Sequence, residues 1–225
     1  MRYKIAILMI LLPQIICAQK NDFQAWYSLD AGFKIGKKWS FGLSDEIRTS
    51  CNAQVFSKNL FDLGGEYKLT ENIDLGLFVR VSTEYPTLES RTHQKTFYTT
   101  FQYSRKFDRL NISGRFRIGT DEDFDMPVQT EWEHREKLKA AYNIKKFPLN
   151  PELSAELFFP AGNDFLGLTK TRILAGFSWR PKSDKNHKFT VQYGWQHKYN
   201  SDVPKNDFLL CLGYGYTFKI KEKKK

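Results

Sequence analysis

Apolar and polar residues alternate in short segments along the chain from residue 22 to residue 218. In the segment 73–85, one face carries the apolar residues Ile73, Leu75, Leu77, Val79 and Val81. The opposite face carries the charged residues Asp74, Arg80 and Glu84. A soluble sandwich turns its apolar face inward and rarely needs an opposite face this charged, whereas a membrane barrel turns apolar residues to lipid and polar residues to its lumen. The pattern therefore predicts an all-β fold, a transmembrane antiparallel β-barrel.

The alternation predicts eleven strands, at residues 22–34, 38–50, 55–69, 73–85, 95–107, 110–119, 129–143, 149–159, 169–180, 188–199 and 207–218. The connections between them are of two kinds. Short, mostly basic turns lie around 36–37, 70–72, 108–109, 145–148 and 181–187, and mostly longer loops at 52–54, 86–94, 120–128, 160–168 and 200–206. Short periplasmic turns and long external loops are typical of outer-membrane barrels.

An odd number of strands is unusual, because bacterial single-chain barrels have an even number. We therefore expect ten to twelve strands, with either one span misassigned or residues 19–34 threading or capping the lumen. The run 131–141 contains many good helix formers, but its alternation favours a strand.

Residues 1–18 have the features of a secretory signal peptide. Two basic residues precede a short apolar run at 5–12, and Ala18 closes the segment. A lipoprotein signal at Cys17 is the alternative, but Ile16 occupies a position that requires a small residue. The expected organisation is a signal peptide at 1–18, an outer-membrane barrel at 19–218 and a basic C-terminal tail at 219–225. The expected location is the outer membrane of a Gram-negative bacterium.

The composition alone excludes few classes of protein. The formal net charge is +10 and the pI about 9.4, but an exported chain rarely meets nucleic acid, so no nucleic-acid partner is expected. Aromatic residues reach 16%. Trp39 and Trp179 flank short turns, where an interfacial girdle belongs, while Trp26 and Trp132 are expected nearer the lumen or the outer rim.

One assumption about the turn near residue 71 sets a register for its hairpin. If Leu69 faces Ile73, the lumen-side pairs have opposite charges: Lys68 with Asp74, Asp62 with Arg80, and Lys58 with Glu84. Alternation points further charged residues inward: Glu46, Arg48, Glu66, Arg115, Arg117, Lys137, Lys139, Glu156 and Arg172. A narrow barrel filled in this way contains a polar network and is largely plugged. If a solute passes, the basic excess at Arg115, Arg117 and Arg172 favours a small anion.

The final strand carries an expected assembly signal. Gly213, Tyr216 and Phe218 resemble the C-terminal pattern that outer-membrane barrels present to the barrel insertion machinery. The pattern departs from that signal because seven residues follow Phe218. Outer-membrane lipid, the insertion machinery and a small anion or outer-surface ligand are the expected partners.

Several patterns extend over the whole mature chain: Trp26, Trp39 after the turn at 36–38, Glu46 with Arg48, Leu63-Gly64 with Tyr67, the series Pro151, Ser154, Glu156 and Phe158, and Arg172. In these features the chain resembles an uncharacterised family of outer-membrane barrels common in Bacteroidetes, domain-of-unknown-function family 2490. The resemblance implies a barrel and its location, and it implies no established activity.

Enzymatic features are weak. Outer-membrane lipid A deacylases place a His and a Ser two residues apart, but here Tyr199 follows His197 at that spacing and Ser201 lies four residues away. The other histidines have no metal-ligand spacing, and no phosphate loop or nucleotide motif is present, so no catalytic residue, metal or cofactor is expected. The favoured function is a structural or binding barrel, or a narrow conduit. The alternatives are a deacylase-like lipid-modifying enzyme and a soluble periplasmic β-protein.

Overall fold

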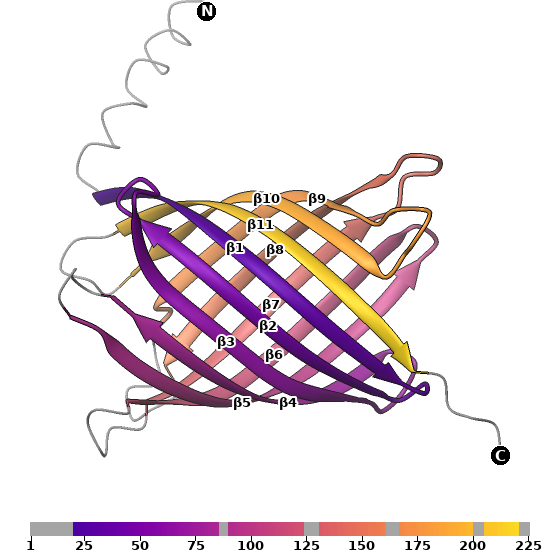
Figure 1. Cartoon of the computed structure of the whole chain (residues 1–225), viewed down its shortest axis with the longest axis horizontal. Coiled ribbons are helices and arrows are strands. Elements are labelled where there is room, and N and C mark those ends of the chain that lie inside the picture. The colour runs from indigo at the N-terminus through magenta and orange to yellow at the C-terminus, as the bar shows by residue number, and fades with distance from the viewer. Residues whose placement is uncertain (1–19, 86–89, 124–130, 161–166, 200–204, 221–225) are drawn as a thin grey trace, which may run out of the picture.

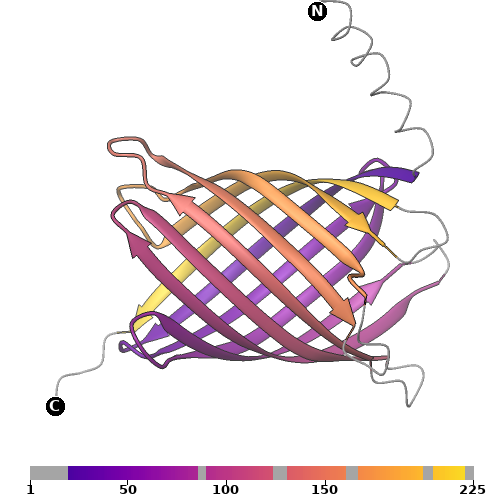
Figure 2. The same cartoon turned by 180° about the vertical axis from the view of Figure 1, so that it is seen from behind.

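The computed structural model describes residues 20–85, 90–123, 131–160, 167–199 and 205–220, which form one closed barrel of eleven strands (Figures 1 and 2). The strands are β1 (Lys20–Ile35), β2 (Trp39–Ser50), β3 (Val55–Lys68), β4 (Ile73–Glu84), β5 (Thr92–Phe107), β6 (Leu110–Asp123), β7 (Glu131–Tyr142), β8 (Leu149–Pro160), β9 (Lys170–Trp179), β10 (His187–Lys198) and β11 (Lys205–Ile220). No helix in these ranges is long and apolar enough to cross a membrane.

The barrel closes through a parallel pair. Each strand is antiparallel to the next, but β1 and β11 pair in parallel from Lys20 opposite Lys205 to Ile35 opposite Ile220. They lie side by side and point the same way in Figure 1. In an up-and-down barrel with an odd number of strands, the first and last strands must run in the same direction. The predicted antiparallel barrel of ten to twelve strands is therefore confirmed, with one parallel pair at the seam, whereas the two alternatives of a misassigned span and of a threaded or capping first segment are wrong.

The element boundaries differ modestly from the expected ones. Strand β5 begins at Thr92, β6 continues to Asp123, and β11 extends from Lys205 to Ile220, because ladder pairing continues beyond the residues that alternate clearly. The run 131–141 is a strand, as predicted. The expected signal peptide at 1–18, Ser201, the tail from residue 221, and parts of the long loops at 86–89, 124–130, 161–166 and 200–204 lie outside the described residues.

The apolar side chains face outward and the polar ones face inward. On β4, Leu77 is 68% exposed, and Leu75 and Val79 are also exposed, whereas Ser82 on the opposite face is 3% exposed. Among the described residues, thirty-seven large hydrophobic side chains are exposed and only seven hydrophobic side chains are buried. The predicted inversion of the usual alternation is confirmed, and the interior of this barrel is mostly polar.

The two ends of the barrel differ in their connections. At one end, the β1–β2 turn contains Gly36, whose φ of 61° is a conformation that glycine adopts readily. The other end holds the β2–β3 connection, where Cys51 is exposed. Cys211 lies well inside β11. Among the described residues, Cys51 and Cys211 are both free.

Candidate functional site in the barrel lumen

A cavity of about 540 Å³ occupies the lumen. Its lining includes residues from all eleven strands. Lys34 and Ser40, on either side of the β1–β2 turn, belong to it, as do Arg180 and Lys188, which border the β9–β10 connection. The cavity therefore extends from the middle of the barrel toward the end with the short turns. Ten Lys and Arg side chains and five Asp and Glu side chains line it, so the lining carries five excess positive charges.

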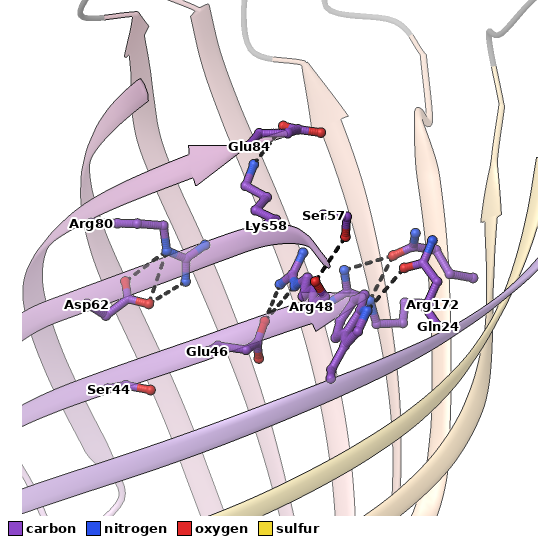
Figure 3. Close-up of polar contacts among 12 residues, drawn as sticks. Gln24, Ser44, Glu46, Arg48, Ser57, Lys58, Asp62, Arg80, Glu84 and Arg172 are labelled. Carbon is purple, nitrogen blue, oxygen red and sulfur yellow. Dashed lines mark hydrogen bonds and ion pairs between the residues drawn. The ribbon is translucent and has the colours of Figure 1, made fainter. Parts of the chain in front are cut away.

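The β3–β4 hairpin has the predicted register. Asp62 lies opposite Arg80, Lys58 opposite Glu84, and Lys68 opposite Asp74. The Arg80 guanidinium donates to Asp62 through Nε at 2.9 Å and through Nη2 at 2.7 Å, and Lys58 Nζ lies 3.1 Å from Glu84 Oε2 (Figure 3). In the described part of the chain no ion pair joins Lys68 to Asp74. Lys68 is exposed near the short-turn end, where water competes for its charge.

Glu156 on β8 is the most heavily paired carboxylate of the lumen. Its side chain is 6% exposed and lies 3.3 Å from Arg172, 3.5 Å from Arg115 and 3.9 Å from Lys137. The cross-strand register places Lys137 and Arg172 directly on either side of it. One acid thus balances three cations that belong to three different strands.

Four other predicted lumen residues, Glu46, Arg48, Glu66 and Lys139, have local partners. Glu46 and Arg48 of β2 form an ion pair at 2.5 Å between Arg48 Nη2 and Glu46 Oε1, which Figure 3 shows. Glu66 accepts a longer hydrogen bond of 3.4 Å from the Ser40 hydroxyl. Lys139 donates to Glu152 at 2.7 Å, and Ser178 donates to the other oxygen of that carboxylate.

Strands β6 and β7 bring four cations together on the lumen side. Arg115 lies directly opposite Lys137, and Arg117 directly opposite Arg135. Like charges in directly opposed positions are unfavourable. Arg135 pairs with Glu133 on its own strand, and Arg115 and Lys137 share Glu156. Arg117, only 6% exposed, instead stacks on the Tyr98 ring with its guanidinium carbon 3.4 Å from the ring centroid.

Aromatic residues inside the lumen were missed by the sequence analysis, apart from Trp26, which was expected near the lumen or the outer rim. The Trp26 ring is 5% exposed and lies between the guanidinium groups of Arg48 and Arg172, at 3.8 and 4.6 Å. Phe158 is fully buried, and the Lys170 ammonium lies 4.0 Å from its ring centroid. The signal was present in the sequence, because each ring occupies a position whose alternation points inward.

A second aromatic contact supports the central hairpin. The Tyr98 hydroxyl donates to Asp62 Oδ1 at 2.7 Å, so Asp62 is held by both Arg80 and Tyr98. Further along the lumen, Trp26 packs with Leu174 and Leu209, and the partly buried Cys211 lies against this cluster. The lumen is therefore filled by charged pairs, by aromatic rings and by one small apolar cluster.

Several of the aromatic residues singled out in the sequence lie on the outside of the barrel. Tyr216 and Phe218 share the outer face of β11, where the Phe218 ring stacks on Phe33 at 4.9 Å. Trp39 and Trp179 are both exposed beside the short turns. Trp132 is also exposed, so only Trp26 of this group reaches the lumen.

Contacts with two neighbouring residues hold the His197 ring in place. Its Nδ1 lies 2.8 Å from the amide oxygen of Asn206, and its ring stacks on Trp195. Ser201 falls outside the described residues. Within the ranges that the structure covers, no three His, Cys, Asp or Glu side chains form a group that could hold a metal ion.

Comparison with protein families gives one match. Residues 23–208 match the family described as "Protein of unknown function (DUF2490)". The chain belongs to this family. No curated protein and no solved structure matched the chain. In this DUF2490 protein the matched range begins in β1 and ends in β11, so it contains every charged residue of the lumen network described above, whereas Gly213, Tyr216 and Phe218 follow it.

Proposed function

We propose that the mature chain, after removal of residues 1–18, is an integral outer-membrane β-barrel of a Gram-negative bacterium. It acts as a structural or binding protein, or as a narrow conduit, and not as a general diffusion pore. The observation that carries this proposal is the band of exposed apolar side chains around a charged interior. Such a continuous apolar surface is unfavourable in water and matches the hydrocarbon core of a bilayer.

The contrast between short turns at one end and long loops at the other supports an orientation with the short turns in the periplasm, and aromatic residues mark a membrane interface at that end. Trp39 lies 4.7 Å from Tyr67, and Trp179 lies 5.1 Å from Phe189, ring centroid to ring centroid, all beside the short turns. Amphipathic rings of this kind concentrate at membrane interfaces. In this orientation the long-loop end, with Cys51, faces the cell exterior.

The filled lumen supports the proposal that the barrel is not a general diffusion pore. An eleven-stranded barrel is narrow, since wide aqueous channels belong to barrels with about sixteen or more strands. The rings of Trp26 and Phe158 are buried inside the lumen, and the Arg172 guanidinium contacts both of them. We also propose a non-catalytic role, because Tyr199 stands where a deacylase has its Ser, two residues after His197. Unchanged lipid A mass in a deletion strain would agree with that role, and a changed acyl pattern would favour the lipid-modifying alternative.

Membrane fractionation combined with heat-modifiable gel mobility tests the location. We expect the wild-type protein in the outer-membrane fraction, with different mobilities before and after boiling. Recovery in the soluble periplasmic fraction would contradict the proposal and favour the soluble alternative.

A membrane-impermeant maleimide added to intact cells tests the orientation. It should label the exposed Cys51, and a Cys51→Ser variant is the control because it keeps only the half-buried Cys211 of the two described cysteines. Labelling of Cys51 only after the outer membrane is permeabilised would reverse the proposed orientation.

A further inference from the structure

Arg117 is a buried cation that has no counter-charge among the described residues. Its residue is 6% exposed, it lines the lumen cavity, and its guanidinium stacks on Tyr98. In the described part of the chain, no carboxylate lies within ion-pair distance of it, and no side chain accepts a hydrogen bond from it. Burial of a charge is unfavourable unless an opposite charge and hydrogen-bond acceptors compensate for it.

The neighbouring acids are already engaged by other cations. Asp62, the carboxylate that also binds the Tyr98 hydroxyl, is held by both prongs of Arg80. Glu133 pairs with Arg135, and Glu156 lies among Arg115, Lys137 and Arg172. The residue directly opposite Arg117 is Arg135, a second cation. The described residues therefore do not supply the negative charge that this part of the lumen requires.

The geometry of the site suits an oxyanion. Guanidinium groups bind phosphate-type oxyanions through paired N–H donors, and a ring face can hold the guanidinium plane in place. Here the Tyr98 ring lies against Arg117 and stacks on Phe78, with 4.9 Å between the ring centroids, and both rings line the cavity. The cavity of about 540 Å³ has room for a tetrahedral anion and for a substituent on it.

We propose that the lumen cavity binds a phosphate-type oxyanion against Arg117, with Arg115, Arg135 and Lys137 as surrounding donors. The cavity extends toward the short-turn end, which the proposed orientation places in the periplasm. The source of the anion therefore rests on the proposed function, whereas the binding site itself does not. The anion is either free phosphate or the phosphate of a lipid headgroup, since both present the same charged oxygens.

Isothermal titration calorimetry can test the site. The protein is purified in dodecyl maltoside without phosphate, and inorganic phosphate is titrated at constant ionic strength. We expect saturable binding to the wild type and at least tenfold weaker binding to Arg117→Gln. The matched control is Arg105→Gln, which removes the same charge from an exposed residue that stacks on Phe107 outside the cavity lining. Its affinity should stay within twofold of the wild-type value.

Heat-modifiable mobility checks that each variant is folded. Arg115→Gln serves as a second test, because the Arg115 side chain is 36% exposed and its removal should disturb the buried ion pairs less than removal of Arg117. Titration with phosphatidylglycerol in phosphatidylcholine vesicles, against phosphatidylcholine alone, separates the two sources. Binding of inorganic phosphate identifies a free anion, and binding of phosphatidylglycerol alone identifies a headgroup. No saturable binding of either probe, or equal affinity in wild type, Arg117→Gln and Arg115→Gln, would overturn the inference. Because the titration uses purified protein, its failure is distinct from a failure of the outer-membrane assignment.

Discussion

Arg80 on β4 and Asp62 on β3 form a two-pronged ion pair between adjacent strands on the lumen side, with Nε–Oδ1 and Nη2–Oδ2 distances of 2.9 and 2.7 Å. Their side chains are 16% and 15% exposed, so little water screens the pair. The Tyr98 hydroxyl binds the same carboxylate. This three-residue contact joins β3, β4 and β5 in the middle of the lumen.

Removal of one partner of this pair should destabilise the barrel strongly. For Arg80→Met we expect a loss of about 3–5 kcal/mol in the free energy of unfolding, because Asp62 would remain buried without its counter-charge. The double variant Asp62→Leu/Arg80→Met should recover much of that loss. Urea unfolding of protein reconstituted in vesicles, followed by tryptophan fluorescence, provides the measurement.

The Lys58–Glu84 pair offers a matched control for this prediction. It lies in the same hairpin, and its Lys58 Nζ–Glu84 Oε2 distance is 3.1 Å, but the Glu84 side chain is 48% exposed. Exposed ion pairs contribute at most about 1 kcal/mol, so Lys58→Met should have a small effect. Equal losses for Lys58→Met and Arg80→Met would show that burial does not decide the strength of these pairs.

The parallel seam between β1 and β11 predicts a specific cross-link. Gly32 lies opposite Thr217, and a Cβ built on Gly32 comes within 3.9 Å of the Thr217 Cα. In a mature chain without Cys51 and Cys211, the pair Gly32→Cys/Thr217→Cys should form a disulfide on mild oxidation and shift in non-reducing gels. The control Gly32→Cys/Leu209→Cys should not, because Leu209 pairs with Gln24. Cross-linking of the control pair alone would exclude the parallel register.

The local pairing of the barrel could be predicted from the sequence. Alternation with a period of two sets which side chains face inward, and a tight turn fixes the register of the hairpin that it joins. The single turn after Leu69 was therefore enough to place Asp62 opposite Arg80. The same reasoning placed Glu156 and Arg172 on the inner face, and they lie opposite each other on β8 and β9.

The closure of the barrel and the centre of its lumen could not be predicted in this way. The β1–β11 pair joins residues about 185 positions apart, for example Asn21 and Asn206, and no turn fixes its register. Trp26 contacts Arg172 across the lumen, a contact that depends on the curvature of the whole sheet. Sequence patterns identified which faces were polar, but they did not identify Arg117 as a cation without an acidic partner in the described part of the chain.

The glycines of β10 and β2 should differ sharply in their tolerance of a side chain. A Cβ on Gly194 would lie 2.0 Å from the Ile173 carbonyl oxygen and 2.9 Å from the Leu174 Cα, which are backbone atoms of the paired strand. A Cβ on Gly42 would meet no atom within 4 Å. We expect Gly194→Ala to destabilise the barrel by about 1–3 kcal/mol through overpacking. Gly42→Ala should be nearly neutral in the same urea titration, and equal effects of the two variants would contradict the close β9–β10 approach.

Conductance of the purified protein in planar bilayers should be small, because rings and ion pairs fill the lumen. Trp26→Ala removes a ring that lies between Arg48 and Arg172 and packs with Leu174 and Leu209, so it should open a conducting path. Trp39→Ala is the matched control, since it removes an equal volume from an exposed residue on the outside of the barrel. Arg117→Ala and Arg80→Ala should also raise the conductance, because each removes a long side chain that lines the cavity.

The selectivity of the opened variant follows from the charges that remain. The cavity lining has ten basic and five acidic side chains, and Trp26→Ala changes none of them. Basic linings favour anions, so the reversal potential of Trp26→Ala in a potassium chloride gradient should indicate chloride preference. Replacement of Arg117 in that variant should reduce the preference. Large, unselective conductance from the wild-type protein would contradict the closed lumen, and cation preference in Trp26→Ala would contradict the role given to its basic lining.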